Sequence, residues 1–327
     1  MKKWLAALSA AFVLIPPCAA IAAGDAYPDR AITWIVPFAA GGPTDAMARN
    51  IANEVSKQLK QTILIENVPG AGGTIGATRV ARAKPDGYTF LVGHIGYMAA
   101  APTLYPQLPY DPVKDFDAVF RFPDTPLVLL VGANSPYRSV QDLIAHGRQN
   151  PGKLNFSNAG VGSTSHLVAA LFASQAHIEI TPIAYKGAGP ALNDLMGGQV
   201  DAMFDQTNTA LPQTRGGKVR ALGLTSAAPM PQFPDAPAIG AQAIPGFEVS
   251  TWYGLYAPHG TPATMIQTLY DAYRQAMQNQ DFTRQMSEQG ILLLPSADYA
   301  PQALQQHTRQ EGQRWAQVIK QAGISLQ

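Results

Sequence analysis

The sequence predicts an α/β fold of two doubly wound domains, joined by a two-strand hinge, with a ligand cleft between them. Three observations carry this prediction. Strand-like and helical patterns alternate at short spacing over residues 32–92, which is typical of a parallel, doubly wound sheet. Junctions of one kind, a strand followed by glycines and a helix, occur at 38–45 and at 159–166. The chain of 327 residues is also long enough for two domains.

The N-terminal segment has the pattern of a secretory signal peptide. Lys2 and Lys3 precede an apolar stretch at 4–15, and a run of small residues follows it. We expect residues 1–22 to be removed by cleavage after Ala22. The apolar stretch is too short to span a membrane as a helix.

The only cysteine of the chain, Cys18, falls within this segment. A lipid-modified Cys18 is the alternative interpretation, but Pro16 and Pro17 stand where a lipidation site usually has small residues. With the signal peptide removed, the mature chain is expected to hold no disulfide and no reactive thiolate.

Charge and composition limit the classes of partner. The formal net charge is +1, and like charges do not form blocks along the chain. This balance argues against nucleic acid or an anionic membrane as the partner. With 14% charged and 46% hydrophobic residues, the chain has the composition of a globular protein.

The first junction follows a predicted buried strand at 32–36. Thr44 and Asp45 are placed to cap the helix after it, whose apolar face is formed by Met47, Ile51, Val55 and Leu59. The turn between strand and helix has little side-chain bulk and consists of Phe38, Ala39, Ala40, Gly41 and Gly42. Free amides and the helix dipole predict an anion site at this turn. The alternative is that the glycines only allow a sharp turn.

The remaining chain continues the alternation. Further strands are predicted at 62–66, 88–92, 126–133, 154–158, 178–182, 200–205, 219–225 and 249–257. Helices are predicted most clearly at 140–149, 262–278, 282–289 and 299–322, and loops at 69–76, 93–98 and the proline-rich 102–124 and 229–245. The strand at 249–257 is expected to return to the first sheet. The predicted domains are therefore 23–125 together with 248–327, and 126–247 inserted between them.

Several motifs bear on other kinds of chemistry. The glycine-rich stretch at 70–76 fails as a dinucleotide fingerprint because Ile75 stands where a third glycine is required. The six histidines show no pair at helical ligand spacing, so neither a metal nor a cofactor is expected. A serine hydrolase acting through Ser163 or Ser165 with His166 is the alternative function, although no nucleophile-elbow motif surrounds either serine.

A set of longer motifs resembles one known family. They are VPFAAGGPTD at 36–45, ENVPGAGGTIG at 66–76, KPDGYT at 84–89, LPYDP at 108–112, NAGVGSTSHL at 158–167, YKG at 185–187 and WYG at 252–254. In this order they resemble the Bug-type, TctC-like periplasmic solute-binding receptors of tripartite tricarboxylate transporters. The resemblance covers the mature chain, with small departures at Ala39, Ala40 and Val68.

The resemblance implies a type II periplasmic binding fold in a periplasmic, monomeric receptor that is not an enzyme. It also implies that the loops at 38–45 and 159–166 grip one carboxylate of a small organic acid. The expected partners are a di- or tricarboxylate, an aromatic acid, an amino acid or a nicotinate-like ligand, and the membrane subunits of a transporter. A sensory partner without transport is a further alternative.

The site predicted from these two loops has defined members. Thr44, Ser163, Thr164 and the amides after Gly41 and Gly162 are expected to hold the carboxylate, with Asp45 bracing its loop. Thr74, His94, Tyr185 and Asp205 are candidates for the variable end of the ligand. The other residues expected in the ligand site are Phe38, Ala39, Ala40, Gly42, Ala159 and Gly160.

Overall fold

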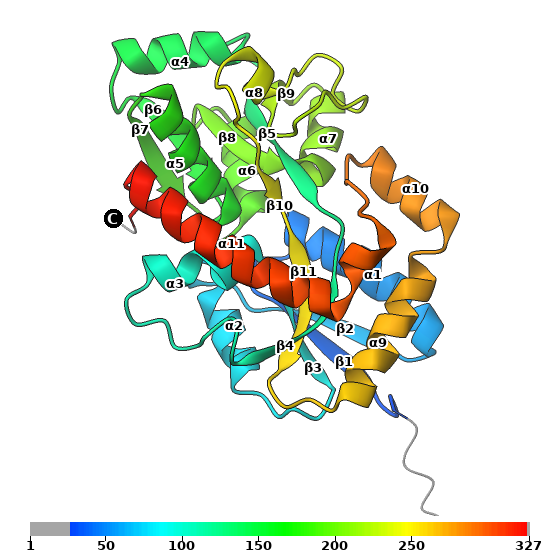
Figure 1. Cartoon of the computed structure of the whole chain (residues 1–327). Coiled ribbons are helices and arrows are strands. Elements are labelled where there is room, and N and C mark those ends of the chain that lie inside the picture. The colour runs from blue at the N-terminus through cyan, green and yellow to red at the C-terminus, as the bar shows by residue number, and fades with distance from the viewer. Residues whose placement is uncertain (1–26, 326–327) are drawn as a thin grey trace, which may run out of the picture.

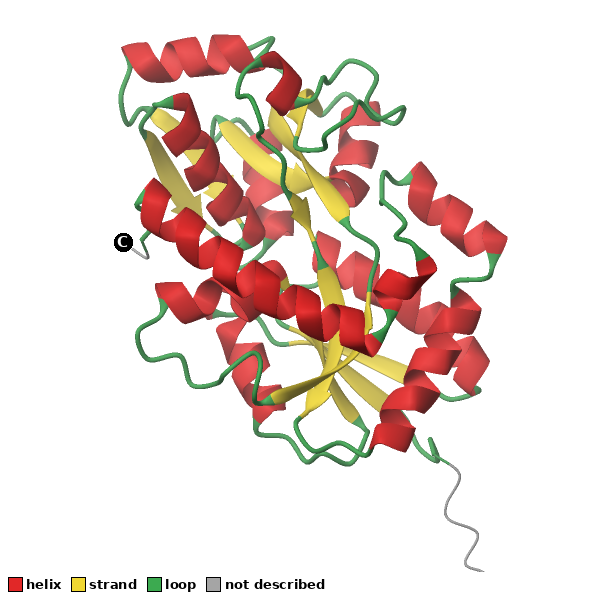
Figure 2. Cartoon of the chain, in the orientation of Figure 1, coloured by secondary structure: helices red, strands yellow, loops and turns green. Residues whose placement is uncertain are grey.

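The computed structural model describes residues 27–325. The predicted signal peptide and Cys18 lie outside the described residues. No helix within residues 27–325 is long and apolar enough to cross a membrane. The described chain folds around two β-sheets, one in the lower and one in the upper half of the view, with helices packed outside them (Figure 2).

The first sheet has the strand order β2-β1-β3-β11-β4. Its strands are β1 (Ile32–Val36), β2 (Ile63–Asn67), β3 (Thr89–His94), β4 (Phe116–Arg121) and β11 (Tyr253–Pro258). β1 is parallel to β2 and β3, as predicted. β11 returns from far along the chain and pairs antiparallel with both β3 and β4, so the sheet is mixed.

The second sheet has the order β10-β5-β8-β6-β7, with β9 also paired to β5. Its strands are β5 (Thr125–Gly132), β6 (Leu154–Asn158), β7 (Ile180–Ala184), β8 (Ala202–Gln206), β9 (Val219–Leu224) and β10 (Ser250–Thr251). β6 is parallel to β7 and β8, whereas β5 is antiparallel to β8 and β9. This sheet is therefore mixed as well.

Helices cover both sheets (Figure 1). Those that follow strands of the first sheet are α1 (Pro43–Leu59), α2 (Thr74–Ala81), α3 (Ala101–Leu104), α9 (Ala263–Ala276), α10 (Gln280–Glu288) and α11 (Pro301–Ala322). Those of the second sheet are α4 (Val140–Gln149), α5 (Thr164–Ala176), α6 (Ala188–Met196), α7 (Thr207–Arg215) and α8 (Ile239–Gln242). Short helical turns lie at η1 (Ala71–Gly73), η2 (Gly96–Ala100) and η3 (Ser296–Tyr299).

Two strand connections and helix α11 join the halves. The chain crosses between β4 and β5 and again between β10 and β11, and Thr125 and Thr251 face each other in register there. Helix α11 packs on β4 and on α5, so it runs along both halves (Figure 1). Trp252 at the second crossing and Trp315 on α11 each donate a hydrogen bond of 3.2 Å to the buried Glu311 carboxylate. The second crossing is therefore tied to the last helix.

Two of the differences between the structure and the sequence prediction lie in and beside the first sheet. Strand β4 lies within 102–124, which was predicted irregular. Its buried Val119 and Phe120 pack beside β11, a pairing that depends on a partner more than a hundred residues away in sequence. The loop predicted at 93–98 is instead the end of β3 followed by a π-helical turn, η2, that leads into α3.

Candidate functional site

A small cavity lies between the two sheets, where β1, β3, β6 and β8 end. Its volume is about 20 Å³, which is room for roughly one water molecule. It is lined by Phe38, Gly42, Pro43, Thr44, His94, Ala159, Ser163, Thr164, Ser165, Ala188, Phe204, Asp205 and Gln206. The carboxyl ends of strands are where α/β sheets bind ligands, so this cavity is the candidate site.

Four helices begin at this cavity. The first residues or caps of α1, α5, α6 and α7 are among its lining residues. The first amides of each helix have no carbonyl partner within the helix, and each N-terminus carries about half a positive charge. Four converging N-termini make the cavity favourable for an anion without a charged side chain.

His94 and Thr164 form a polar contact that joins the two halves at the cavity. The Gly96 amide donates to Nδ1 of His94 over 3.0 Å, so the ring proton is on Nε2. Nε2 lies 2.7 Å from Oγ1 of Thr164 and donates to it. Burial lowers the pKa of His94 to about 3, which keeps the ring neutral. The Thr164 hydroxyl thus accepts from His94 and keeps its own proton for a ligand.

Asp45 holds the glycine turn before α1. Its carboxylate accepts hydrogen bonds from the Gly41 amide at 3.0 Å, from Arg49 at 2.9 Å and from Asn67 at 2.9 Å. Burial alone would raise the pKa of Asp45, but these donors lower it below its ordinary value. The ionised carboxylate therefore holds the turn at Gly41 in place, and its charge is already paired with Arg49.

The serines at the start of α5 are bonded to each other and to the backbone. Ser163 Oγ lies 3.1 Å from Ser165 Oγ, and Ser165 Oγ accepts from the Ala159 amide over 2.9 Å. The His166 ring instead accepts from the Gly162 amide through Nδ1 at 3.3 Å. Within residues 27–325, neither serine is hydrogen-bonded to a histidine ring, so the pair expected of a hydrolase is not formed.

Asp205 and Gln206 close the cavity from the second sheet. Asp205 is 2% exposed, and Thr209 donates to its Oδ2 over 2.7 Å. Burial raises the pKa of Asp205 to about 7, although the hydrogen bonds from Thr209 and the Gln206 amide act in the opposite direction. The Tyr253 hydroxyl on β11 donates to Gln206 Oε1 over 2.5 Å, which links the two sheets at a residue that lines the cavity.

The sequence model of the tripartite tricarboxylate transporter family receptors, TctC, matches residues 47–324. The chain belongs to this family. It is also similar to solved periplasmic receptors. The periplasmic binding protein BugD is 38% identical with a TM-score of 0.88, over 91% of this chain and 99% of that one. The two-domain periplasmic binding fold and the Bug-type resemblance are thereby confirmed.

Two further relatives were solved with ligands. MatC from Rhodopseudomonas palustris, with bound malate, is 40% identical with a TM-score of 0.86, over 90% of this chain and 100% of that one. Another R. palustris protein, with adipate, is 35% identical with a TM-score of 0.87, over 91% and 99% of the two chains. The relatives of this TctC-family receptor are thus solute-binding proteins.

The structure brings part of the predicted set to the cavity of this receptor. The predicted residues that line it are Phe38, Gly42, Thr44, His94, Ala159, Ser163, Thr164 and Asp205. Those that do not are Ala39, Ala40, Gly41, Asp45, Thr74, Gly160, Gly162 and Tyr185. Thr74 donates to the Ala71 carbonyl and Tyr185 to the Asp194 carboxylate. The Ser163 amide, expected to face the ligand, donates to the Gly160 carbonyl.

The predicted ligand site lacked five lining residues: Pro43, Ala188, Phe204, Gln206 and Ser165, the last considered only as a hydrolase nucleophile. Pro43 lies inside the recognised motif at 36–45, and Ala188 follows the YKG motif directly. Phe204 and Gln206 flank Asp205 at the end of a predicted strand. Proximity to recognised positions could have indicated all of them, but the convergence of α6 and α7 with α1 could not be read from spacing.

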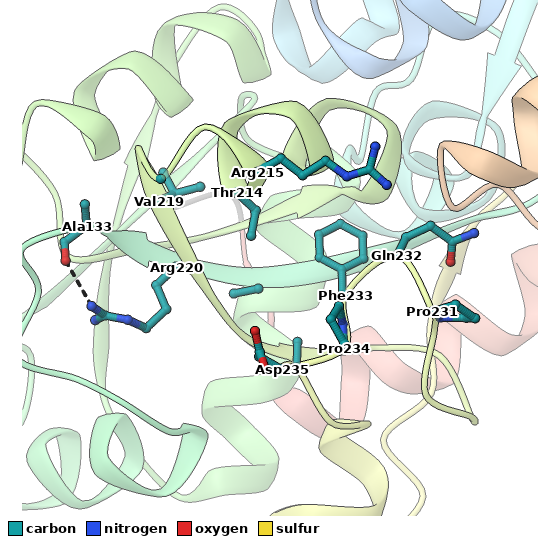
Figure 3. Close-up of a pocket in the computed structure, with 13 residues that line it drawn as sticks. Ala133, Thr214, Arg215, Val219, Arg220, Pro231, Gln232, Phe233, Pro234 and Asp235 are labelled. Atoms are coloured by element: carbon teal, nitrogen blue, oxygen red, sulfur yellow. Dashed lines mark hydrogen bonds between the residues drawn. The ribbon is translucent and has the colours of Figure 1, made fainter.

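A larger pocket, of about 620 Å³, lies beside β9 and shares no lining residue with the cavity. Figure 3 shows Arg220, Arg215 and Phe233 in its wall. The Arg220 guanidinium already donates to the carbonyls of Ala133, Ser135 and Tyr137. It is therefore occupied in holding the chain after β5, and this pocket does not offer it to a carboxylate. Within the described part of the chain, no group of three or more metal-ligating side chains occurs.

Proposed function

We propose that this receptor captures a small organic carboxylate in its interdomain cleft and delivers it to a tripartite tricarboxylate-type transporter. The observation that carries the proposal is the convergence of four helix N-termini and the Thr164 hydroxyl on one buried cavity. Relatives with bound malate and adipate support the same ligand class. The proposed ligand donors are Thr44, Ser163, Thr164 and the first-turn amides of α1 and α5.

Neutral donors are sufficient for this task. A helix N-terminus contributes about 0.3–1 kcal/mol to a nearby anion, and a hydrogen bond to a charged group contributes about 1.5–3 kcal/mol. A micromolar complex requires only about −8 kcal/mol. A cleft in which no arginine pairs with the ligand carboxylate therefore binds tightly enough for uptake and still releases its ligand.

The size of the cavity requires the cleft to open for a ligand to enter. Contacts that cross the cleft include the His94–Thr164 hydrogen bond and the one from Asn208 to the Pro43 carbonyl at 3.4 Å. Two strand crossings allow rotation of one half against the other. We place the domain boundaries accordingly, with residues 23–125 and 248–327 in one domain and 126–247 in the other.

The proposal includes export and the absence of catalysis. Residues 1–22 act as a cleaved signal peptide that delivers a monomeric receptor to the periplasm. The ring of His166 faces the Gly162 amide, which supports a receptor in place of a serine hydrolase. The alternative is that the bound receptor acts on a sensory partner and not on a transporter, since the ligand would occupy the same cleft in either case.

A thermal-shift screen of the mature chain against a carboxylate library tests the proposal. Ligand at a hundred times its dissociation constant stabilises the folded state by about 2.7 kcal/mol, and each kcal/mol raises Tm by about 2–4 °C in a chain of this size. Malate and adipate are the first probes, with their diamides as uncharged controls. Absence of a shift with every carboxylate, or ester hydrolysis that is lost in Ser163→Ala, would contradict the proposal.

A further inference from the structure

Asp205 places an acidic side chain inside a cavity built for anions. It stands at the end of β8 and lines the cavity, with only 2% of the residue exposed. Its donors are the Thr209 hydroxyl, at 2.7 Å, and the Gln206 amide. In the described chain, no lysine, arginine or histidine forms an ion pair with it.

The groups that face Asp205 do not supply a balancing cation. His94 from β3 is neutral, and Tyr253 from β11 has its hydroxyl on Gln206. Asp45 at the start of α1 is paired with Arg49. The lining residues from α5 and α6 carry hydroxyls or no polar group, and are Ser163, Thr164, Ser165 and Ala188.

The positive charge at the cavity therefore comes from the helices alone. Four N-termini at about half a charge each amount to roughly two positive charges. A dicarboxylate dianion neutralises this amount completely. An ionised Asp205 would add a third negative charge in a closed, buried site, where uncompensated charge is strongly unfavourable.

We propose that Asp205 acts as a neutral carboxylic acid in the bound state and donates its proton to one carboxylate of a dicarboxylate dianion. This inference rests on the proposed function and narrows its ligand class. A zwitterionic amino acid would instead need an ionised Asp205 to meet its ammonium group, so dicarboxylates are preferred over amino acids of equal length. The raised pKa of Asp205 agrees with the geometry.

The consequence is that ligand binding takes up a proton. Above the pKa that Asp205 has in the open receptor, its carboxyl group is ionised and must take up a proton before the cleft closes on a dianion. The dissociation constant then rises by up to about tenfold per pH unit, because one proton enters with each ligand.

Calorimetric titration with adipate and malate between about pH 6 and pH 9 tests this inference. The native receptor should show weaker binding at higher pH, and buffers of different ionisation enthalpy should report uptake of about one proton per ligand. Asp205→Asn keeps a donor without a titrating group. It should bind as tightly as the native receptor at the lowest pH, show little pH dependence and bind more tightly than it at the highest pH.

Two further variants complete the test. Asp235→Asn removes an exposed carboxylate in the pocket of Figure 3 and should keep the native pH slope. Thr209→Val removes a donor that favours the ionised form of Asp205, so its affinity should begin to fall at a higher pH than in the native receptor. If Asp205→Asn fails to fold, the pH dependence of affinity in Thr209→Val tests the inference in its place.

Three results would overturn the inference. One is a native dissociation constant that does not change with pH, and another is an unchanged pH slope in folded Asp205→Asn. The third is tighter binding of aspartate or glutamate than of dicarboxylates. Each leaves carboxylate binding itself intact, whereas failure of every carboxylate to bind at any pH would remove the proposed function as well.

Discussion

Gly72 offers a way to block closure of the cleft without altering the cavity. It lies in the turn η1 with φ +61°, and a Cβ added there would stand 2.1 Å from the Val161 carbonyl oxygen of the opposite half. The neighbouring Tyr105 hydroxyl lies within 3.4 Å of the Ala71 and Val161 carbonyls. Gly72→Ala therefore forces two backbone segments apart in the closed form only.

The size of the effect follows from this contact. A backbone carbonyl cannot rotate aside as a side chain does, and overpacking of this kind costs about 1–3 kcal/mol. The backbone strain of an alanine at positive φ is present in the open and closed forms alike, so it cancels from the binding free energy. Gly72→Ala should therefore weaken ligand binding by about 5- to 150-fold.

The assay is a calorimetric titration with adipate or malate, beside a matched variant. Gly217→Ala has the same backbone strain, with φ +66°, but its added Cβ meets nothing within 4 Å. Both variants should lose similar thermal stability, and only Gly72→Ala should lose affinity. Equal affinity of the two variants would refute the reasoning that ligand is held by closure of these loops.

Two further substitutions test the site itself. Thr164→Val removes the proposed ligand donor and leaves the His94 proton unpaired, so affinity should fall by about 1.5–3 kcal/mol in titrations with the same probes, and native affinity would remove Thr164 from the site. Asp45→Asn weakens the brace on the Gly41 turn and should lower the free energy of unfolding by about 1–3 kcal/mol. Because the folded pKa of Asp45 is depressed, its contribution is present above the ordinary aspartate pKa and is lost as the pH falls through the folded pKa. The difference in unfolding free energy between the native protein and Asp45→Asn, measured by denaturant, should therefore disappear in acid. A difference that persists there would contradict the role assigned to Asp45.

Much of the fold could be predicted because its strands and helices carry strong local patterns. The helix predicted at 140–149 matches α4, whose ends are marked by the Ser139 cap and by Asn150. The return of 249–257 to the first sheet was also predicted, and β11 lies there. Strand β4 was missed because its two polar positions and neighbouring prolines conceal a strand that is defined by its partner.

The site was predictable in its motifs and not in its distances. Glycine junctions predicted which turns would face a ligand, and the structure places Thr164 and Ser163 in the lining of the cavity. Which atoms remain available depends on tertiary contacts. The Ser163 amide donates a hydrogen bond to the Gly160 carbonyl, and the His94 ring donates one to the Thr164 hydroxyl across the cleft. Residues from α6 and α7 could not be assigned to the cavity without the arrangement of the second sheet.

A crystal structure of the mature receptor grown with malate or adipate tests the central claim most directly. We predict a carboxylate between the first turns of α1 and α5, with an oxygen about 3 Å from Thr164 Oγ1. Ligand bound instead in the pocket of Figure 3, beside Arg220, with the cavity between the sheets unoccupied, would contradict it.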